Sequence, residues 1–226
     1  MQVKGIIFDY GGTIDTGGCH WGKMLWHAYQ RQQVPVSEDQ FREAYVYAER
    51  LLGKNPVIQP DFTFRQTLET KVRIEMEQLG VAAYAEAVVS DLYELTKAQT
   101  QHSREVLLRL SEWYPMVLVS NFYGNIGVVL REFGLDGIFQ QIVESAVVGI
   151  RKPDPRIFTL GVEALGLPAS SVLVVGDSMD KDILPARQAG CQTVWFKGEG
   201  WTDDPVDGSQ ADLIITDLKE LKVLYH

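Results

Sequence analysis

The chain has few cysteines and no long apolar run. Cys19 and Cys191 are the only two cysteines in 226 residues, and because they show no metal-ligand spacing we expect free thiols in a reducing compartment. No apolar stretch approaches the roughly 20 residues that cross a bilayer, and the N-terminus lacks the charged-then-apolar pattern of a signal segment. These absences predict a cytoplasmic protein without a membrane partner.

Cations are also scarce. The chain has 21 Lys and Arg residues against 30 Asp and Glu residues, which gives a formal net charge of -9. Such a chain repels nucleic acid and anionic membranes, so we expect neither as a partner. The sequence contains no phosphate-binding P-loop and no dinucleotide-binding glycine fingerprint. A small anionic molecule is still compatible with this composition, because a few local donors can bind it.

Short apolar runs recur along the chain and alternate with helical stretches. They are Val3–Phe8, Met116–Val119, Val172–Val175, Thr193–Phe196 and Leu213–Ile215. Nearly continuous apolar runs are typical of parallel strands that helices cover on both faces, and the alternation indicates an α/β fold. We therefore predict a Rossmann-like parallel sheet, in a chain long enough for one such domain and an insertion.

The insertion lies between about residues 15 and 97, where the pattern is helical and contains no strand. Ser37 and Gln40 form a capping-box pattern at the start of one helix. Asp61 is placed to cap a second helix, which ends at Gly80, and a further segment covers Ala82–Lys97. This pattern predicts a small helical domain inserted directly after the first strand.

We place the helical cap at residues 16–99 and the core at residues 1–15 and 100–226. The expected hinges are Gly17-Gly18 and the region Lys97–Ser103. The stretch Lys197–Gln210 is rich in Gly and Asp, and we predict that it forms a surface loop.

Three of the predicted strands end at a polar residue: Asp9, Ser120 or Asp177. In an open α/β sheet, ligands bind at the carboxyl ends of the strands, so we expect these side chains to share one site. Asp9 and Asp177 would repel each other without a cation, and oxygen ligands of this kind suit Mg²⁺. Ser120 lacks the flanking glycines of a serine nucleophile elbow.

Four segments in the same order resemble the motifs of the haloacid dehalogenase-like (HAD) superfamily, in its phosphatase-like branch with a helical type-1 cap. Asp9-Tyr10-Gly11-Gly12-Thr13 is similar to the first motif, Asp-x-Asp-Gly-Thr, and Ser120-Asn121 to the second. Arg151-Lys152-Pro153-Asp154-Pro155 is similar to the third motif, and Gly176–Asp182 is similar to the fourth. The likeness runs from Val3 to about Leu221.

This resemblance implies a role for each motif. Asp9 would be the nucleophile that forms an aspartyl-phosphate, with Ser120 and Lys152 as the other catalytic residues. The phosphate-binding set would be Gly11, Gly12, Ser120, Asn121 and Lys152. The Mg²⁺ ligands would be Asp9, the backbone carbonyl of Gly11 and Asp177. Asp182 would act in an outer or water-mediated position and would anchor Lys152.

The chain departs from the pattern at Gly11, which stands where the superfamily has its general acid/base Asp. Loss of this group typically costs about 10²–10⁴-fold in rate. A substrate with a good leaving group, such as an aryl or acyl phosphate, would need little acid assistance. Otherwise Asp15, Tyr10 or a cap residue would have to take over the role.

Two other branches of the superfamily also lack the second Asp. Haloacid dehalogenases need no metal, and phosphonoacetaldehyde hydrolases use a cap lysine, for which Lys23 and Lys54 are candidates here. The acidic fourth motif and the third motif favour a Mg²⁺-dependent hydrolase of a small phosphorylated metabolite, as monomer or homodimer. A catalytically weak phosphate-binding or regulatory relative, and C–P or C–halogen cleavage, are the alternatives.

Overall fold

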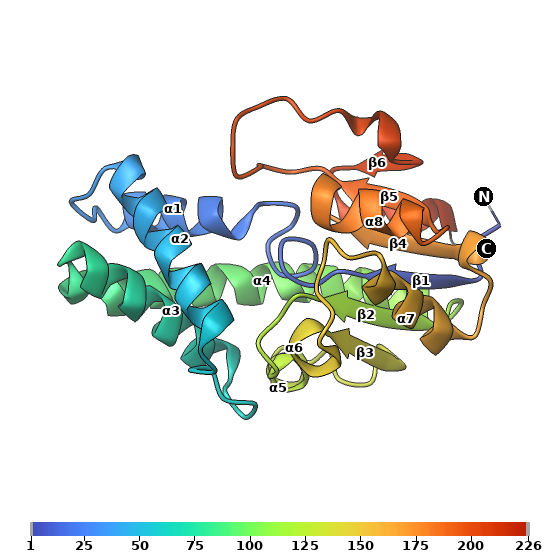
Figure 1. Cartoon of the computed structure of the whole chain (residues 1–226), viewed down its shortest axis with the longest axis horizontal. Helices are drawn as coiled ribbons and strands as arrows, with labels where there is room; N and C mark the ends of the chain where they lie inside the picture. The colour runs from blue at the N-terminus through green and yellow to red at the C-terminus, as the bar shows by residue number, and fades with distance from the viewer. Residues whose placement is uncertain (1, 225–226) are drawn as a thin grey trace.

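The computed structural model describes residues 2–224 and contains one parallel six-stranded sheet with the strand order β3-β2-β1-β4-β5-β6 (Figure 1). The strands are β1 (Gly5–Phe8), β2 (Met116–Ser120), β3 (Gln141–Glu144), β4 (Val172–Gly176), β5 (Gln192–Phe196) and β6 (Leu213–Ile215). Every pair of neighbouring strands is parallel. The predicted α/β class is therefore confirmed.

The sheet has one strand that the sequence analysis did not predict. β3 begins with the exposed Gln141 and the half-buried Ile142, and only its last two residues are buried. An edge strand of this kind lacks the continuous apolar run by which the other five were recognised.

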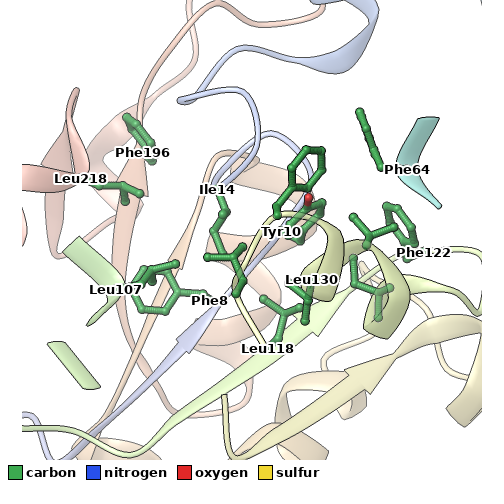
Figure 2. Packing of buried hydrophobic residues seen from close by; sticks show 14 of the residues in the cluster. Phe8, Tyr10, Ile14, Phe64, Leu107, Leu118, Phe122, Leu130, Phe196 and Leu218 are labelled. Carbon is green, nitrogen blue, oxygen red and sulfur yellow. The ribbon is translucent and has the colours of Figure 1, made fainter. Parts of the chain in front are cut away.

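Helices cover both faces of the sheet. They are α1 (Trp21–Arg31), α2 (Glu38–Lys54), α3 (Phe64–Leu79), α4 (Ala85–Ser111), α5 (Ile126–Glu132), α6 (Ser145–Val148), α7 (Arg156–Leu165) and α8 (Leu184–Gln188). Phe8 of β1 packs with Leu107 of α4 and Leu130 of α5 on one face (Figure 2). Ile7 points to the opposite face, where it packs with Phe158 of α7. This alternation is the reason that the central strand is apolar throughout.

Helices α1, α2, α3 and the first part of α4 pack together beside the sheet (Figure 1). Ser37 and Gln40 form the predicted capping box at the start of α2. Our expectation for α3 is wrong in its first residue: Thr63, not Asp61, caps this helix, because Gln66 stands three residues after Thr63 and completes a second capping box. Gly80 ends α3 in a left-handed conformation, as predicted.

The region Lys97–Ser103, which we expected as the second hinge, contains no break, because α4 continues through it. This segment contains no Gly or Pro. Thr100 and Ser103 are fully buried, and the Ser103 hydroxyl donates to the backbone carbonyl of Ile14 at 2.7 Å. α4 thus extends from the helical region into the core as a single element (Figure 1). At the other connection, Gly17 and Gly18 have positive φ values of 68° and 88°.

The loop after β5 returns to the helical region. The Trp201 ring lies 4.9 Å from the Tyr45 ring and beneath the Arg42 guanidinium, at 4.2 Å. Arg42 also donates to the Trp201 carbonyl at 3.0 Å. A Cβ on Gly22 would approach the indole to 2.1 Å, so α1 needs a glycine at this contact. The loop that was predicted to cover the surface therefore joins core and helices.

No helix within residues 2–224 is both long and apolar enough to cross a membrane. Cys19 and Cys191 are both free thiols.

Candidate active site

A cavity of about 170 Å³ lies between the carboxyl edge of the sheet and helices α1 to α3. Three neighbouring strands contribute to it, since Asp9 follows β1, Ser120 ends β2 and Asp177 follows β4. The predicted site residues that line it are Asp9, Gly11, Ser120, Asn121, Lys152, Asp177 and Asp182. The structure therefore brings together side chains that are up to 173 positions apart in the sequence, from Asp9 to Asp182.

Lys152 is the central cation of this edge. Its Nζ lies 2.5 Å from Asp9 Oδ1 and 2.6 Å from Asp182 Oδ1, and all three side chains are buried. Burial alone lowers the pKa of an ammonium, but the carboxylates of Asp182 and Asp9 outweigh it and raise the pKa of Lys152. Lys152 therefore stays charged at physiological pH.

Three carboxylates lie close together at this edge, and Lys152 pairs with two of them. Oxygen atoms of Asp9, Asp177 and Asp182 all lie within 4.8 Å of one another. Burial raises the pKa of Asp9 to about 6, with Lys152 acting in the opposite direction. Burial, followed by repulsion from Asp182 and Asp9, raises the pKa of Asp177 well above its usual value. A cation bound at this position would relieve the excess of negative charge.

The donor set fits Mg²⁺. The Thr13 hydroxyl lies between Asp9 Oδ2, at 3.3 Å, and Asp177 Oδ1, at 3.2 Å, and so holds the two carboxylates together. In the part of the chain that the structure describes, no donor reaches the backbone carbonyl of Gly11, which leaves this oxygen free for a ligand. Two carboxylates and a carbonyl are hard oxygen ligands of the kind that Mg²⁺ takes, with water in the other positions.

The glycine pair after Asp9 has two different environments. Gly12 has a φ of 99°, and a Cβ there would lie 2.4 Å from the Asp177 carboxylate, so only glycine fits. Its N–H donates to Asp15 Oδ1 at 2.8 Å and is already used within the protein. A Cβ on Gly11 would instead meet only the Trp21 indole, at an ordinary 3.8 Å. The position of the missing acid/base is therefore open to a side chain.

Of the two replacements named by residue, Asp15 lines the cavity and Tyr10 does not. It is fully buried and accepts hydrogen bonds from Gly12 N and, at 2.9 Å, from Trp21 Nε1. Burial raises the pKa of Asp15 to about 7, although both hydrogen bonds act to lower it. Tyr10 is fully buried against Phe122, with ring centroids 5.9 Å apart, and does not line the cavity (Figure 2).

Ser120 and Asn121 differ in what they offer a phosphate. Within residues 2–224 the hydroxyl of Ser120 has no protein hydrogen-bond partner and is free to donate into the cavity. The Asn121 side chain accepts from Lys152 N at 2.9 Å and donates to the Lys152 carbonyl at 3.1 Å. Asn121 thus holds the backbone that carries the central lysine.

The helical side of the cavity contains an ion pair that the sequence analysis missed. Lys71 of α3 lies 2.5 Å from Glu49 of α2, and its ammonium is 4.5 Å from the centre of the Tyr45 ring. The Tyr123 hydroxyl donates to the same Glu49 oxygen at 3.3 Å. A signal was present in the sequence, because Lys71 interrupts the buried face of α3.

The two lysines expected from the phosphonatase comparison lie elsewhere. Lys23 contacts Asp203 at 3.2 Å and Glu38 at 3.7 Å, and Lys54 is exposed at the end of α2. Neither lines the cavity. Lys71 does so, but its partner Glu49 raises the pKa of its amine well above the usual value against the effect of burial, so that it is held as an ammonium.

Comparison with known proteins identifies the family. The family model of haloacid dehalogenase-like hydrolases matches residues 3–190. The glyceraldehyde 3-phosphate phosphatase of Pyrococcus furiosus is 28% identical over 227 residues, which cover 97% of this chain and 92% of that protein. The phosphoglycolate phosphatase of Vibrio parahaemolyticus is 27% identical, with 98% of this chain and 95% of that protein covered.

A solved structure supports the same fold. The HAD-hydrolase YfnB of Bacillus subtilis, bound to magnesium, matches with a TM-score of 0.61 and 18% identity over 99% of both chains. The family model covers most of the chain, and residues from the four motif-like segments of the sequence meet at one edge of the sheet. The protein is thus a member of the haloacid dehalogenase-like hydrolase family.

Proposed function

We propose that the protein is a Mg²⁺-dependent phosphatase that acts on a small phosphorylated metabolite through an aspartyl-phosphate at Asp9. The observation that carries this proposal is the buried Asp9 carboxylate, which lies at the cavity floor with the Lys152 ammonium 2.5 Å away. The phosphatase names of the relatives from Pyrococcus furiosus and Vibrio parahaemolyticus support a small phosphate ester as substrate.

In the first step, a carboxylate oxygen of Asp9 attacks phosphorus, and the bond from phosphorus to the leaving oxygen breaks. In the second step, water attacks the aspartyl-phosphate, which releases inorganic phosphate and restores Asp9. Catalysis of phosphoryl transfer consists mainly of positioning and charge stabilisation. Lys152 and the free Ser120 hydroxyl supply that stabilisation, and Asp182 and Asn121 hold Lys152 in place.

Asp9, Asp177 and the Gly11 carbonyl would hold the Mg²⁺. When bound, this ion offsets the negative charge of the carboxylates and of the phosphoryl oxygens. Asp182 is committed to other partners, since one oxygen accepts from Lys152 and the other from Ser178 N at 3.0 Å. We therefore assign it to positioning Lys152 and not to direct metal contact.

The leaving oxygen needs a proton unless its conjugate acid is strong. Gly11 offers none, and the Asp15 carboxyl is held by two donors, Gly12 N and Trp21 Nε1. We therefore infer a weakened acid/base step and a preference for esters with good leaving groups, such as aryl or acyl phosphates. The penalty on alkyl phosphates should fall in the range of about 10²–10⁴-fold that general acid catalysis contributes.

The other branches fit less well. A Schiff base requires a neutral amine, whereas the cavity lysine of the cap is paired with Glu49. Metal-free dehalogenation would leave Asp9, Asp177 and Asp182 without a compensating cation. We further propose that residues 16–99 act as a cap over a core of residues 1–15 and 100–226, because both parts line the cavity.

The test replaces Asp9 by Asn and measures Mg²⁺-dependent release of phosphate from p-nitrophenyl phosphate. Asp9→Asn keeps the shape of the side chain but removes the nucleophile, so activity should be abolished in a protein that still folds. Asp154→Asn is the matched control, because the Asp154 side chain pairs with Arg156 at the surface and does not line the cavity. An Asp9→Asn protein with wild-type turnover would show that Asp9 is not the nucleophile.

A further inference from the structure

The cap side of the cavity carries a buried cation that the phosphoryl-transfer step does not use. The Lys71 side chain is only 10% exposed, yet it lines the cavity opposite the strand ends. An ammonium has three donors, and within residues 2–224 its one carboxylate contact is with Glu49. At least one N–H therefore has no anionic partner in the protein.

A second cation faces the same carboxylate. Arg151 also lines the cavity. Burial alone would raise the pKa of Glu49, but Lys71 and, to a smaller extent, Arg151 outweigh it and hold this pKa below its usual value. In the described chain Arg151 makes no salt bridge of its own. Among the residues that line this end of the cavity, two cations thus face the single carboxylate of Glu49. The buried Glu75 also acts on Lys71 but lies outside the lining, and burial raises its pKa to about 7.

Two partners hold the Glu49 carboxylate. Its Oε1 accepts from the Tyr123 hydroxyl while it pairs with Lys71, and Lys71 rests on the Tyr45 ring. Since Tyr123 follows β2 whereas the other groups belong to the cap, the cluster is assembled only when cap and core are together. A ligand that reaches this cluster would contact both parts of the protein.

We propose that Lys71 and Arg151 bind a carboxylate on the leaving group of the substrate, so that the protein prefers phosphate esters with an acidic group at the far end. The proposal rests on the proposed phosphatase function and specifies its substrate class. A charge-assisted hydrogen bond to a buried ammonium favours the carboxylate over a neutral group of the same shape, because water no longer screens the pair.

The test measures binding and so does not depend on turnover. The probes are phosphonoacetate and its longer homologue phosphonopropionate, each compared with its neutral amide by calorimetry in the presence of Mg²⁺. A phosphonate occupies the phosphoryl site without being hydrolysed as an ester. For at least one chain length we expect the carboxylate to bind about ten- to a hundredfold more tightly than the amide, the range for hydrogen bonds to charged groups.

Substitutions on the two sides of the ion pair should act in opposite directions. Lys71→Gln should remove most of the preference for the carboxylate, and Arg151→Gln, at an exposed side chain that the fold does not need, should reduce it. Glu49→Gln should increase the preference, because it frees the ammonium from its internal partner. Lys23→Gln is the matched control, since Lys23 is also a buried cap lysine paired with carboxylates but does not line the cavity.

Two results would overturn the proposal: equal binding of acid and amide at both lengths, or a loss of carboxylate preference in Glu49→Gln. The second result would indicate that Glu49 binds a cationic group of the substrate instead. Release of phosphate from phenyl phosphate is measured in parallel. A protein that hydrolyses phenyl phosphate but shows no carboxylate preference refutes only this inference, whereas failure both to hydrolyse it and to bind any phosphonate refutes the proposed function as well.

Discussion

Restoring the missing carboxylate by Gly11→Asp tests the central peculiarity of this chain. The backbone tolerates the change, because Gly11 is absent from the positions with positive φ and its Cβ would meet only Trp21, at 3.8 Å. Gly11 lines the cavity, so the new side chain starts at the place where a leaving group would be protonated. The substitution therefore adds a candidate general acid without a predicted clash.

The size of the gain follows from two opposing effects. General acid catalysis contributes about 10²–10⁴-fold. Against this, the new carboxylate would share the Trp21 neighbourhood with Asp15, whose carboxylate accepts the indole N–H at 2.9 Å. Repulsion between the two carboxylates lowers the gain, and we expect about 10–100-fold in kcat/KM on alkyl phosphates, or roughly 1.4–3 kcal/mol of barrier. Aryl phosphates, whose leaving oxygen needs little protonation, should gain about threefold or less.

The assay compares kcat/KM for an alkyl phosphate and for p-nitrophenyl phosphate at saturating Mg²⁺. Equal or lower activity on both substrates, in a Gly11→Asp protein that folds and binds Mg²⁺, would refute the reasoning. Asp15→Asn separates the remaining explanation. If Asp15 already supplies the proton, Asp15→Asn alone should lose much of the activity and Gly11→Asp should rescue it.

Three further outcomes are expected. Asp177→Ala should abolish the Mg²⁺ binding that calorimetry detects in the wild-type protein, and unchanged binding would place the metal elsewhere. Burial raises the pKa of Glu75 from 4.5 to about 7, although Lys71 acts to lower it. As the pH rises, Glu75 therefore ionises in the unfolded chain before it does so in the folded protein, and the stability of the fold decreases between about pH 4.5 and about pH 7. The Glu75→Gln side chain stays neutral at every pH, so this variant does not lose stability in this way. The difference in unfolding free energy between Glu75→Gln and the wild type, measured in urea, should therefore grow by about 3 kcal/mol in favour of the variant from about pH 4 to about pH 8. A difference that does not change with pH would contradict this. Gly12→Ala should lower the free energy of unfolding by at least about 1–2 kcal/mol, because alanine disfavours this left-handed backbone, and contact with Asp177 should add to the loss. Gly11→Ala should change the free energy of unfolding by less than about 1 kcal/mol. Equal melting temperatures for the two variants would contradict this turn geometry.

The sequence by itself determined the fold class and the edge of the sheet at which the candidate site lies. Parallel strands buried on both faces must be apolar along their length, so β1, β2 and β4 were visible as continuous runs. Their carboxyl ends meet at one edge, and the polar residue after each run therefore had a predictable place. Local capping chemistry likewise predicted the start of α2 and the end of α3.

Only the tertiary structure decided the rest, because it depends on contacts between distant segments. β3 is an edge strand with an exposed beginning. α4 continues through the region that we expected as a hinge, and there the Ser103 hydroxyl donates to the backbone of Ile14. The pairing of Lys71 with Glu49 requires α2 and α3 to pack side by side and is not encoded in a short motif. The positions of the polar residues at the strand ends follow from the parallel sheet, which the sequence pattern predicts. The residues of the opposite cavity wall come together only because separate helices pack against one another and against the core.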